Sequence, residues 1–443
     1  MDSQAPHNNF VSLEKLVSLC KRRGFIFQTA EIYGGVNGLY DAGPLGCLMK
    51  KNIRNLWMRS FNQLEYDVVF LDGALIGPEP MWKASGHISN FHDPMVDCIV
   101  CKHRYRADDI SLEKPCAHCG NKQWTEIRDF NLMFTTHVGA NTEQSTTAYL
   151  RPETAQNIFV QFKNVLSTTR AKLPFGIAQI GKAFRNEITP KQFLFRMREF
   201  EQMELEFFCK PAESNGFYDF WRSQRMLFMK NIGITADRIR LYEQSPQERS
   251  HYSQGTSDIE YHFSFGWKEL EGIAHRGDFD LTQHMAHSGK DLKVYDEEAK
   301  ESYTPHVVEC SVGVDRIFLT LLYDAYFEET IDDEVRCVLR LHPAVAPITV
   351  AILPLTKKQH ERAHGLYKKL KHASISVDYD LSGSIGKRYR RQDEIGTPFC
   401  ITVDFETEDD NCVTIRHRDS MAQERISITE IMAVIQKALS IDF

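Results

Sequence analysis

Residues 181–204 read GKAFRNEITPKQFLFRMREFEQME, which predicts two strands joined by a turn around residues 189–192. Because side chains alternate along a strand, the charged residues of this hairpin would gather on one side of a sheet. Alternation would place Arg185 and Glu187 on one face of the first strand, and Arg196, Arg198 and Glu204, together with the aromatic Phe200, on one face of the second. So many charges would be costly in an apolar core. We therefore expect this face of the hairpin to hold a charged ligand.

A second segment, far downstream, is expected to reach the same ligand. Residues 309–316 read ECSVGVDR and lead into an apolar helix at 317–322. A glycine-bearing turn at this point could bring Arg316 next to the hairpin. Between residues 148 and 209, apolar and charged residues alternate through several predicted short strands, a pattern that favours an antiparallel sheet.

The N-terminal part of the chain has clear helix signals. Ser12 is a good N-cap for an apolar stripe that begins at Leu13, and Gly24 follows its predicted end. Gly43 and Pro44 open a second predicted helix, which runs through Trp57. A strand-like segment at 68–71 follows it.

Four of the eleven cysteines fall into two matched pairs, Cys98-x2-Cys101 and Cys116-x2-Cys119, with fourteen residues between the pairs. Two such loops can each present two thiolates to one zinc ion in a tetrahedral arrangement. The alternative is four unrelated thiols, which the close spacing of two matched pairs makes the poorer interpretation. We expect a small zinc-binding insertion over residues 95–125.

The last hundred residues alternate strand and helix patterns, which predicts a separate α/β domain from about residue 343. Its strands are expected at 348–355, 375–379, 399–403 and 412–415, with a helix carrying Ala363, Leu366 and Leu370 on one face. Ser427-x-x-Glu430 predicts a capping box for a final helix.

Charge and hydropathy exclude some functions. The chain has 53 basic and 60 acidic residues, a net charge of −7, so it cannot coat nucleic acid by bulk charge. The basic run 387–391 (KRYRR) is by itself more typical of a solvated face than of an RNA site. The most apolar run, 342–355, is short and contains three prolines, so no membrane segment is expected. A cytoplasmic location is the default expectation.

Several of these motifs resemble one known family. FRNE at 184–187 with the following RMREF resembles motif 2 of class II aminoacyl-tRNA synthetases, and GVDR at 313–316 resembles motif 3. Within that class, the chain resembles the homodimeric glycyl-tRNA synthetases from about residue 13 to residue 439. The segments that support this are SGH at 85–87, RYRAD at 104–108, RPETAQ at 151–156, ECSVGVDR at 309–316 and GKRYRRQDEIGTP at 386–398.

The resemblance implies a fold and a reaction. The fold is α+β, with an antiparallel-sheet class II catalytic domain over 1–342 that includes the zinc-ribbon-like insertion, and an α/β anticodon-binding domain over 343–443. The reaction joins glycine to ATP, forming glycyl-adenylate and pyrophosphate, and then transfers the glycyl group to the 3′ end of tRNA(Gly). The implied partners are glycine, ATP with Mg²⁺, tRNA(Gly) and a second copy of the chain, and the basic run becomes a plausible RNA contact.

The resemblance also implies roles for individual residues at the nucleotide. Arg185 would bind the α-phosphate and the glycine carboxylate, and Arg196 would bind the γ-phosphate. Phe200 and Arg316 would sandwich adenine, whose amino group would donate to Glu187. The implied ATP-binding set is Arg185, Asn186, Glu187, Phe195, Arg196, Phe200, Glu269, Leu270, Gly313, Asp315 and Arg316, with Arg185 and Arg316 catalytic and Glu269 a candidate Mg²⁺ ligand.

Glycine offers no side chain to recognise, so its ammonium group must be read by carboxylates and larger amino acids must be excluded by space. The implied glycine-binding set is Arg106, Glu153, Phe200, Gln202, Glu204, Glu309 and Ser311.

Other interpretations remain open from the sequence. Arg185, Glu187 and Arg316 could form a structural ion-pair network. Glu153 could cap a helix that begins near residue 152, and Glu204 could be a solvated strand residue. At the level of function, the alternatives are a class II synthetase for another small amino acid and a non-catalytic nucleic-acid-binding paralogue on the same fold.

Overall fold

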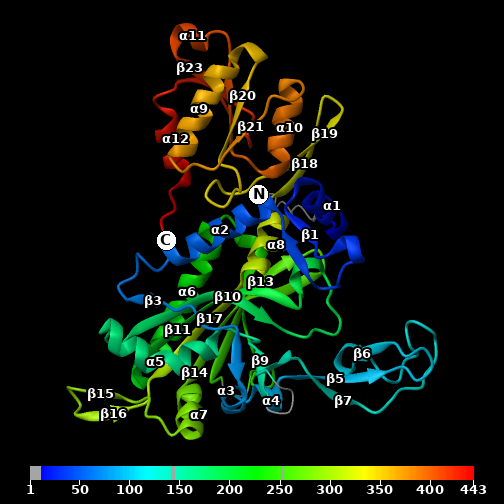
Figure 1. The fold of residues 1–443 in the computed structure, drawn as a ribbon, viewed down its shortest axis with the longest axis vertical. Helices are drawn as coiled ribbons and strands as arrows, with labels where there is room; N and C mark the ends of the chain where they lie inside the picture. The colour runs from blue at the N-terminus through cyan, green and yellow to red at the C-terminus, as the bar shows by residue number, and fades with distance from the viewer. Residues whose placement is uncertain (1–10, 141–144, 251–252) are drawn as a thin grey trace, which may run out of the picture.

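The computed structural model describes residues 11–140, 145–250 and 253–443. The C-terminal residues form a distinct lobe at one end of the molecule, above a larger lobe built on a central sheet (Figure 1). A small module that contains β5 to β7 projects sideways from the larger lobe (Figure 1). Within the described residues, we find no helix with both the length and the hydrophobicity needed to cross a bilayer.

The two predicted N-terminal helices are present. In α1 (Leu13–Arg23), the Ser12 hydroxyl accepts from the Lys15 N–H at 3.3 Å. Gly24 ends that helix in the left-handed region, with φ of 73°, which glycine adopts without the strain of a side chain. α2 (Pro44–Arg59) begins with its proline at the first turn, where the missing N–H costs no helical hydrogen bond.

The central sheet has seven strands, and nearly all of its neighbours are antiparallel. In spatial order the strands are β12 (Ile239–Glu243), β13 (Gly255–Phe263), β14 (Gly266–Gly277), β17 (His306–Gly313), β11 (Glu199–Cys209), β10 (Phe175–Phe184) and β3 (Val68–Phe70). The antiparallel prediction is confirmed for this sheet except at its edge, where β3 runs parallel to β10. The sequence of β3 has the apolar pattern of a strand, but nothing in that pattern specifies whether β3 runs parallel or antiparallel to its neighbour.

The prediction of several short strands between 148 and 209 is wrong. The region contains β9 (Thr146–Leu150), a fifteen-residue helix α5 (Ala155–Thr169) and the two long strands β10 and β11. Helix α5 buries Ile158, Phe159 and Phe162, a spacing that follows the helical period. The short-strand prediction treated these residues as part of one alternating pattern.

The two faces of the central sheet have different environments. On β11, Met203, Leu205 and Phe207 lie in the main apolar core with residues of α6 (Ser214–Asn231) and α8 (Val314–Ala325). The alternate residues of β11 point to the other face, where α5 and α7 (Phe279–Ser288) cover only one end, around Phe208. The rest of that face is therefore left for polar side chains.

The remaining elements of the larger lobe are short. They are β1 (Ile26–Gln28) with β2 (Tyr40–Ala42), β4 (Ile76–Pro78) and β8 (Thr135–Val138) with β9, β15 (Val294–Asp296) with β16 (Glu301–Tyr303), β18 (Tyr326–Ile331) with β19 (Glu334–Leu339), and the helices α3 (Glu79–Ala84) and α4 (His87–Asn90). The projecting module pairs β5 (His92–Asp97) with β6 (Arg104–Arg106) and β7 (Arg128–Asn131).

The C-terminal lobe has the predicted strand and helix alternation. Its five-stranded sheet runs β21 (Val377–Tyr379), β20 (Val350–Pro354), β22 (Phe399–Val403), β23 (Cys412–His417) and β24 (Gln423–Ser427), with helices α9 (His360–His372), α10 (Ile385–Ile395), α11 (Thr407–Asp410) and α12 (Ile431–Leu439). Ala363, Leu366 and Leu370 of α9 are buried, as predicted. The boundary near residue 343 stays a prediction; it falls in the connection between β19 and β20.

Two local interpretations change in this lobe. The final helix begins at Ile431 with Glu430 as its N-cap residue, and the predicted box survives only as a bond from the Ser427 N–H to the Glu430 carboxylate, 3.1 Å long. The basic run lies on α10, where it is only partly solvated. Arg388 is buried and donates to the carbonyl oxygen of Pro354 at 2.6 Å, and Arg391 pairs with Asp380.

Candidate active site

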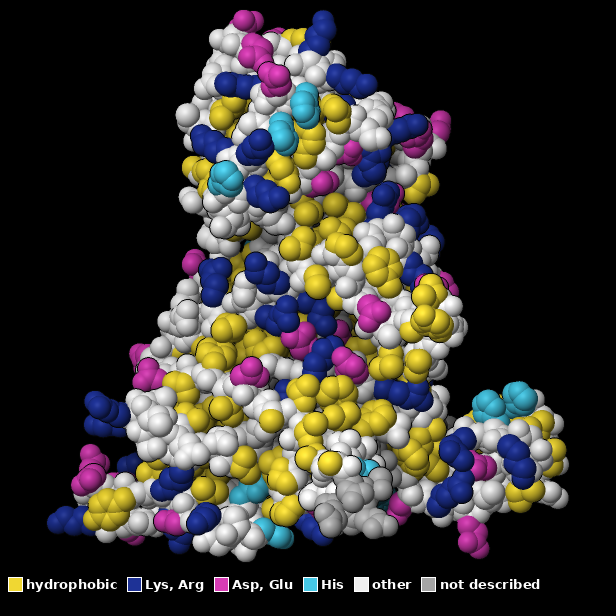
Figure 2. Space-filling model, viewed as in Figure 1, with side chains coloured by type: hydrophobic (Ala, Val, Ile, Leu, Met, Phe, Trp, Pro, Cys, Tyr) yellow, Lys and Arg dark blue, Asp and Glu magenta, His cyan; other side chains and the backbone are white. Residues whose placement is uncertain are grey.

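Both motif segments line one cavity of about 340 Å³, at the end of the central sheet where β10 ends and β11 begins. Basic and acidic side chains gather in the hollow at the middle of the face shown in Figure 2. Of the eleven residues predicted to bind ATP, ten line the cavity, and Asn186 is the exception. The Asn186 backbone N–H instead donates to the carbonyl oxygen of Leu132, 2.7 Å away. The predicted convergence of the two motifs is therefore present in the tertiary structure.

Arg185, Glu187, Arg196 and Arg198 lie just beyond the ladder of the hairpin, whose last pair is Phe184 and Glu199. Glu204 lies within the ladder, opposite Gln179. Arg185 donates through Nε to the Pro152 carbonyl oxygen at 3.1 Å. Its guanidinium carbon lies 5.3 Å from the centre of the Phe200 ring, a cation–π distance. The Phe91 ring lies at the same distance, so Arg185 is held by a carbonyl oxygen and two rings, and no carboxylate among the described residues pairs with it.

Arg196 and Arg198 do not share a role, although the alternating pattern placed them on one face. Arg196 lines the cavity and donates through Nε to Glu187 Oε2 at 2.7 Å. Arg198 lies outside the lining residues and donates to the backbone oxygens of Glu187 and Asn37. Because the two arginines precede the first ladder pair of β11, the backbone there is free to depart from strand alternation.

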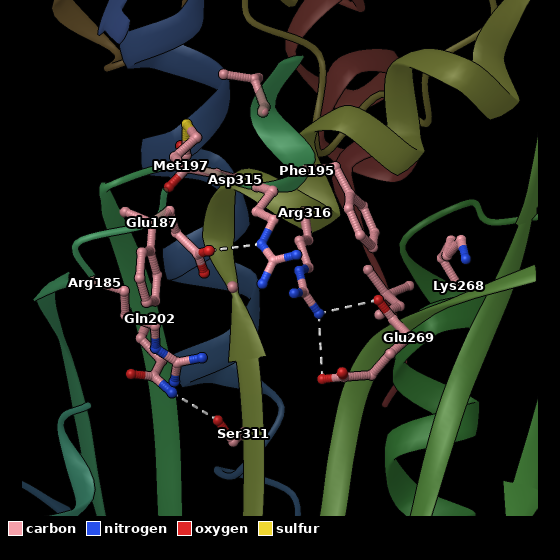
Figure 3. A pocket seen from close by; sticks show the side chains of 15 residues that line it. Arg185, Glu187, Phe195, Met197, Gln202, Lys268, Glu269, Ser311, Asp315 and Arg316 are labelled. Carbon is pink, nitrogen blue, oxygen red and sulfur yellow. Dashed lines mark hydrogen bonds and ion pairs between the residues drawn. The ribbon is translucent and has the colours of Figure 1, made fainter. Parts of the chain in front are cut away.

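Arg316 enters the cavity from the first turn of α8. Its guanidinium carbon lies 4.6 Å from the centre of the Phe195 ring, and Nη1 is 3.2 Å from both the backbone and a carboxylate oxygen of Glu269. Figure 3 shows Arg316 extended toward Glu269. In this arrangement Arg316 stacks on Phe195, whereas Phe200 faces Arg185.

Asp315 lines the cavity, but its carboxylate is already bonded. One oxygen accepts from Lys50 Nζ of α2, and the other accepts from the Glu201 N–H of β11, both at 2.9 Å. Lys50 is itself mostly buried. These bonds join α2, β11 and the start of α8, and so fix the position of the backbone from which the Arg316 side chain extends.

Glu204 lies beneath the cavity floor that Gln202 and Ser311 form. Its two oxygens accept from the N–H and hydroxyl of Thr154, at 2.8 and 2.5 Å, and from Ser311 Oγ and Gln202 Nε2, at 2.8 and 2.5 Å. In Figure 3, Gln202 points toward Ser311. Glu204 is only 1% exposed, so the solvated-strand interpretation is wrong. Burial, with the charges of Glu153 and Glu309, raises the pKa of Glu204 to about 8.

Glu153 and Glu309 lie close enough to Glu204 to influence its charge. Glu153 accepts from Gln156 Nε2 at 3.0 Å and pairs with His87 Nε2 at 3.3 Å. Burial alone would raise the pKa of Glu153, but His87 and Arg276 lower it overall. Burial raises the pKa of Glu309 despite the opposing charge of Arg276. Within the part of the chain that the structure describes, Glu153 bonds to two side chains and to no backbone N–H of α5, so it is not a simple helix cap.

Arg106 is placed differently from the rest of the predicted glycine set. It lies at the end of β6 in the projecting module. Like Glu153, Glu204 and Glu309, it is outside the cavity lining, which of this set includes Phe200, Gln202 and Ser311. Its guanidinium pairs with Asp93 Oδ1 at 3.0 Å. Burial raises the pKa of Asp93, although Arg106 opposes this. A glycine contact for Arg106 stays a prediction.

Sequence reasoning missed two buried groups behind this site. Arg276 and Asp280 form a two-bond ion pair next to Glu309, and both are about 2% exposed. The only signal was charged residues in the apolar stretch 270–281. Cys310, although between Glu309 and Ser311 in the chain, points to the opposite face and belongs to the apolar core.

The four paired cysteines do converge. Their sulfur atoms all lie within 4.8 Å of one another, with Cys98 and Cys119 3.6 Å apart and Cys101 and Cys116 3.7 Å apart. A tetrahedral zinc site with Zn–S bonds of about 2.3 Å requires S···S separations of about 3.8 Å. The donor set and its spacing therefore fit zinc, and the alternative of four unrelated thiols is not supported.

The fold and the cavity together define a class of protein. A mostly antiparallel sheet presents an FRNE strand and a GVDR helix start to one cavity, with arginines on its walls and carboxylates beneath its floor. This is the core of a class II aminoacyl-tRNA synthetase, an enzyme class that uses ATP with Mg²⁺.

Comparison with known proteins agrees with this class. Residues 134–326 match the family described as "tRNA synthetase class II core domain (G, H, P, S and T)", and residues 349–438 match "Anticodon binding domain". The chain is 50% identical to the glycine–tRNA ligase of Caldanaerobacter subterraneus subsp. tengcongensis, covering 97% of this chain and 99% of that protein. It is also 50% identical to the glycine–tRNA ligases of Treponema denticola (96% and 97% covered) and Geobacillus kaustophilus (97% and 99% covered).

The chain therefore belongs to the glycine–tRNA ligase family. The family resemblance drawn from the sequence motifs is confirmed.

Proposed function

We propose that this protein is an ATP-dependent glycine–tRNA ligase that forms glycyl-adenylate and then charges tRNA(Gly). The observation that supports this most directly is the layered cavity. Arg185, Arg196 and Arg316 line its walls, where a polyphosphate would need positive charge, and Glu204 lies beneath its floor, where an ammonium group would need negative charge.

In the first step, the glycine carboxylate attacks the α-phosphate of ATP and pyrophosphate leaves. Such a reaction needs in-line positioning and positive charge where negative charge develops, and it needs no covalent intermediate with the protein. Arg185 is the arginine suited to the α-phosphate, because no carboxylate in the described part of the chain neutralises it. Arg196 would bind the γ-phosphate while Glu187 holds its side chain in place.

The adenine would occupy the part of the cavity next to Arg316, Phe195 and Phe200. Stacking of a base on an aromatic ring and on a guanidinium needs only flat surfaces a few ångströms apart. Glu269 is half-exposed and pairs with Arg316, so it could also bind Mg²⁺ that enters with ATP. Bound Mg²⁺ would neutralise phosphate charge in the transition state.

Glycine selection would come from the floor. Gln202 donates to Ser311, and Ser311 donates to Glu204, so in the proposed site these two side chains would occupy the floor and exclude a substrate side chain. The carboxylates of Glu204, Glu153 and Glu309 would attract the ammonium group. Exclusion of a larger amino acid by a steric clash is the easier direction of discrimination, so the proposed ligase needs no editing site.

The same proposal includes four further features. Residues 1–342 would form the catalytic part and 343–443 the anticodon-binding part, and Cys98, Cys101, Cys116 and Cys119 would hold a structural zinc ion. A homodimer is supported by apolar side chains in the connection between β1 and β2 that are open to solvent, with Ile32 88% and Tyr33 86% exposed. A cytoplasmic location is the last part of this proposal.

The function itself is tested by ATP–pyrophosphate exchange. We expect exchange with glycine and only background exchange with serine, alanine or threonine, because the floor excludes side chains. Exchange with one of the other three would indicate a synthetase for a different small amino acid. No exchange with any amino acid, combined with binding of RNA or DNA, would favour a non-catalytic paralogue.

Glycine binding should strengthen as the pH rises toward 8. In the free protein the pKa of Glu204 is about 8, so this carboxyl is mostly protonated at neutral pH. The glycine ammonium favours the ionised form, so binding lowers the pKa of Glu204 and releases a proton. By linkage, the KM for glycine should fall by up to about tenfold per pH unit between pH 6 and 8.

The pH prediction is checked by exchange kinetics at several pH values. The KM for ATP at the same pH values is the internal control. A Glu204→Gln variant cannot ionise and should bind glycine weakly with no dependence on pH in this range. A glycine KM that is flat from pH 6 to 8 in the unaltered protein would contradict the assignment of Glu204.

A further inference from the structure

A buried arginine behind the cavity is bonded to one of the proposed glycine carboxylates. Arg276 donates through Nη1 to Glu309 Oε2 at 2.5 Å. Its Nε and Nη2 donate to the two oxygens of Asp280, at 2.7 and 2.8 Å. Arg276 is 2% exposed and does not line the cavity, so it cannot contact the nucleotide there.

The backbone at Arg276 departs from regular strand pairing. The pairing of β14 with β17 shifts register at Arg276, because His275 lies opposite Val308 and Gly277 lies opposite Val307. A bulge of this kind bends a strand and redirects a side chain. The redirected guanidinium lies against the Phe159 ring of α5, 5.2 Å from its centre. Helix α5, helix α7 and the sheet therefore meet at this one side chain.

The same network reaches the second carboxylate of the proposed site. Gln156 Nε2 of α5 lies 3.1 Å from Asp280 Oδ1 and 3.0 Å from Glu153 Oε1. The other atom of this amide, Oε1, lies 2.8 Å from His284 Nε2 of α7. Glu153 and Glu309, which are far apart in the sequence, are thus connected through Gln156, Asp280 and Arg276.

Among the three carboxylates of the proposed glycine site, this network leaves one oxygen available to accept from an ammonium group. Both oxygens of Glu204 and both oxygens of Glu153 have partners. In Glu309, only Oε2 has a hydrogen-bond partner within the described residues. The Glu309 side chain remains 9% exposed, against 2% for Arg276. Arg276 therefore holds Glu309 from the buried side.

We propose that Arg276 is a positioning residue for glycine. It holds Glu309 so that Oε1 stays free for the ammonium group, and through Asp280 and Gln156 it fixes the position of Glu153 relative to Glu309. The proposal rests on the proposed role of Glu309 in the glycine site. A guanidinium is required because it donates to two carboxylates at fixed angles. A lysine at this position would keep the charge but could not make the paired bonds to Asp280 while reaching Glu309.

A matched control lies on the opposite face of the same strand. Arg225 of α6 donates through Nε to Glu271 Oε1 of β14 at 2.6 Å, and their side chains are 2% and 0% exposed. This pair is as buried as Arg276 and Asp280, but no hydrogen bond or ion pair of Arg225 involves Glu153, Glu204 or Glu309. Replacement of Arg225 should therefore lower the stability of the protein without changing its affinity for glycine.

The test compares Arg276→Lys and Arg225→Lys in glycine-dependent pyrophosphate exchange. For Arg276→Lys we expect the KM for glycine to rise about tenfold or more, with the KM for ATP changed less than about twofold. For Arg225→Lys we expect a lower melting temperature with both KM values unchanged. If Arg276→Lys does not fold, Asp280→Asn replaces it and should raise the same KM by a smaller factor.

The outcomes separate this inference from the proposed function. Equal rises in both KM values, or a fall in kcat alone, in the Arg276 or Asp280 variant would show a merely structural role and overturn the inference. An unchanged glycine KM would overturn it as well. Absence of exchange in the unaltered protein would instead overturn the proposed ligase function.

Discussion

Replacement of Arg185 by alanine should lower glycine-dependent pyrophosphate exchange by about a thousandfold or more, because the variant would lack the one side chain proposed to contact both reacting groups. The proposed role of Arg185 places its guanidinium between the α-phosphate and the glycine carboxylate. Its only hydrogen-bonding partner among the described side-chain contacts is the Pro152 carbonyl oxygen, so its loss leaves no buried charge unpaired. The chain should therefore fold normally.

Lys182→Ala is the matched control for this variant. Lys182 lies three residues earlier, on β10, and forms a half-exposed ion pair with Glu199, 2.8 Å long, outside the cavity lining. Pairs of this kind contribute about 0–1 kcal/mol, so the control should keep nearly full exchange. Circular dichroism and melting temperature should be normal for both variants. Near-normal exchange in Arg185→Ala would refute the assigned role.

The second large effect is expected at the cysteine cluster. We expect about one zinc ion per chain in protein purified without chelator, and none in a Cys101→Ser variant, because three thiolates and a hydroxyl bind zinc far more weakly. Structural zinc contributes about 10–16 kcal/mol of apparent binding free energy in zinc-finger peptides near pH 7. The variant should therefore lose the local fold around residues 98–119.

Metal analysis and limited proteolysis measure the two halves of this prediction. Cleavage of the variant should concentrate in the projecting module, and the same protease should leave the unaltered protein intact there. Cys47→Ser changes an exposed cysteine outside the cluster and should keep zinc and protease resistance. Unaltered protein that contains no metal would refute the zinc assignment.

How far the sequence predicts the structure depends on the range of the interaction. Ser12 and Gly24 act on the backbone next to them, so the bounds of α1 could be predicted to within a residue. The buried stripe of α9 follows from its periodicity. The paired cysteines were recognisable because each pair lies within one short loop.

Motif order allowed the candidate site to be predicted without distances. FRNE and GVDR occupy positions 184–187 and 313–316, and the structure brings both to one cavity. Strand alternation then failed at the end of the ladder, where Arg196 lines the cavity and Arg198 does not. Alternation is a property of a paired backbone, and it says nothing about residues beyond the last pair.

The sequence by itself determined the class of fold, the family, the cluster of four cysteines and most of the residues that line the cavity, because each of these depends on local pattern or on recognisable motifs. Only the tertiary structure decided the parallel edge strand β3, the burial of Arg388 in a basic run, and the link from Arg276 through Asp280 and Gln156 to Glu153. Each of these depends on which surfaces meet after the chain has folded. The cost of an unpaired buried charge then selects the partners, wherever they lie in the chain.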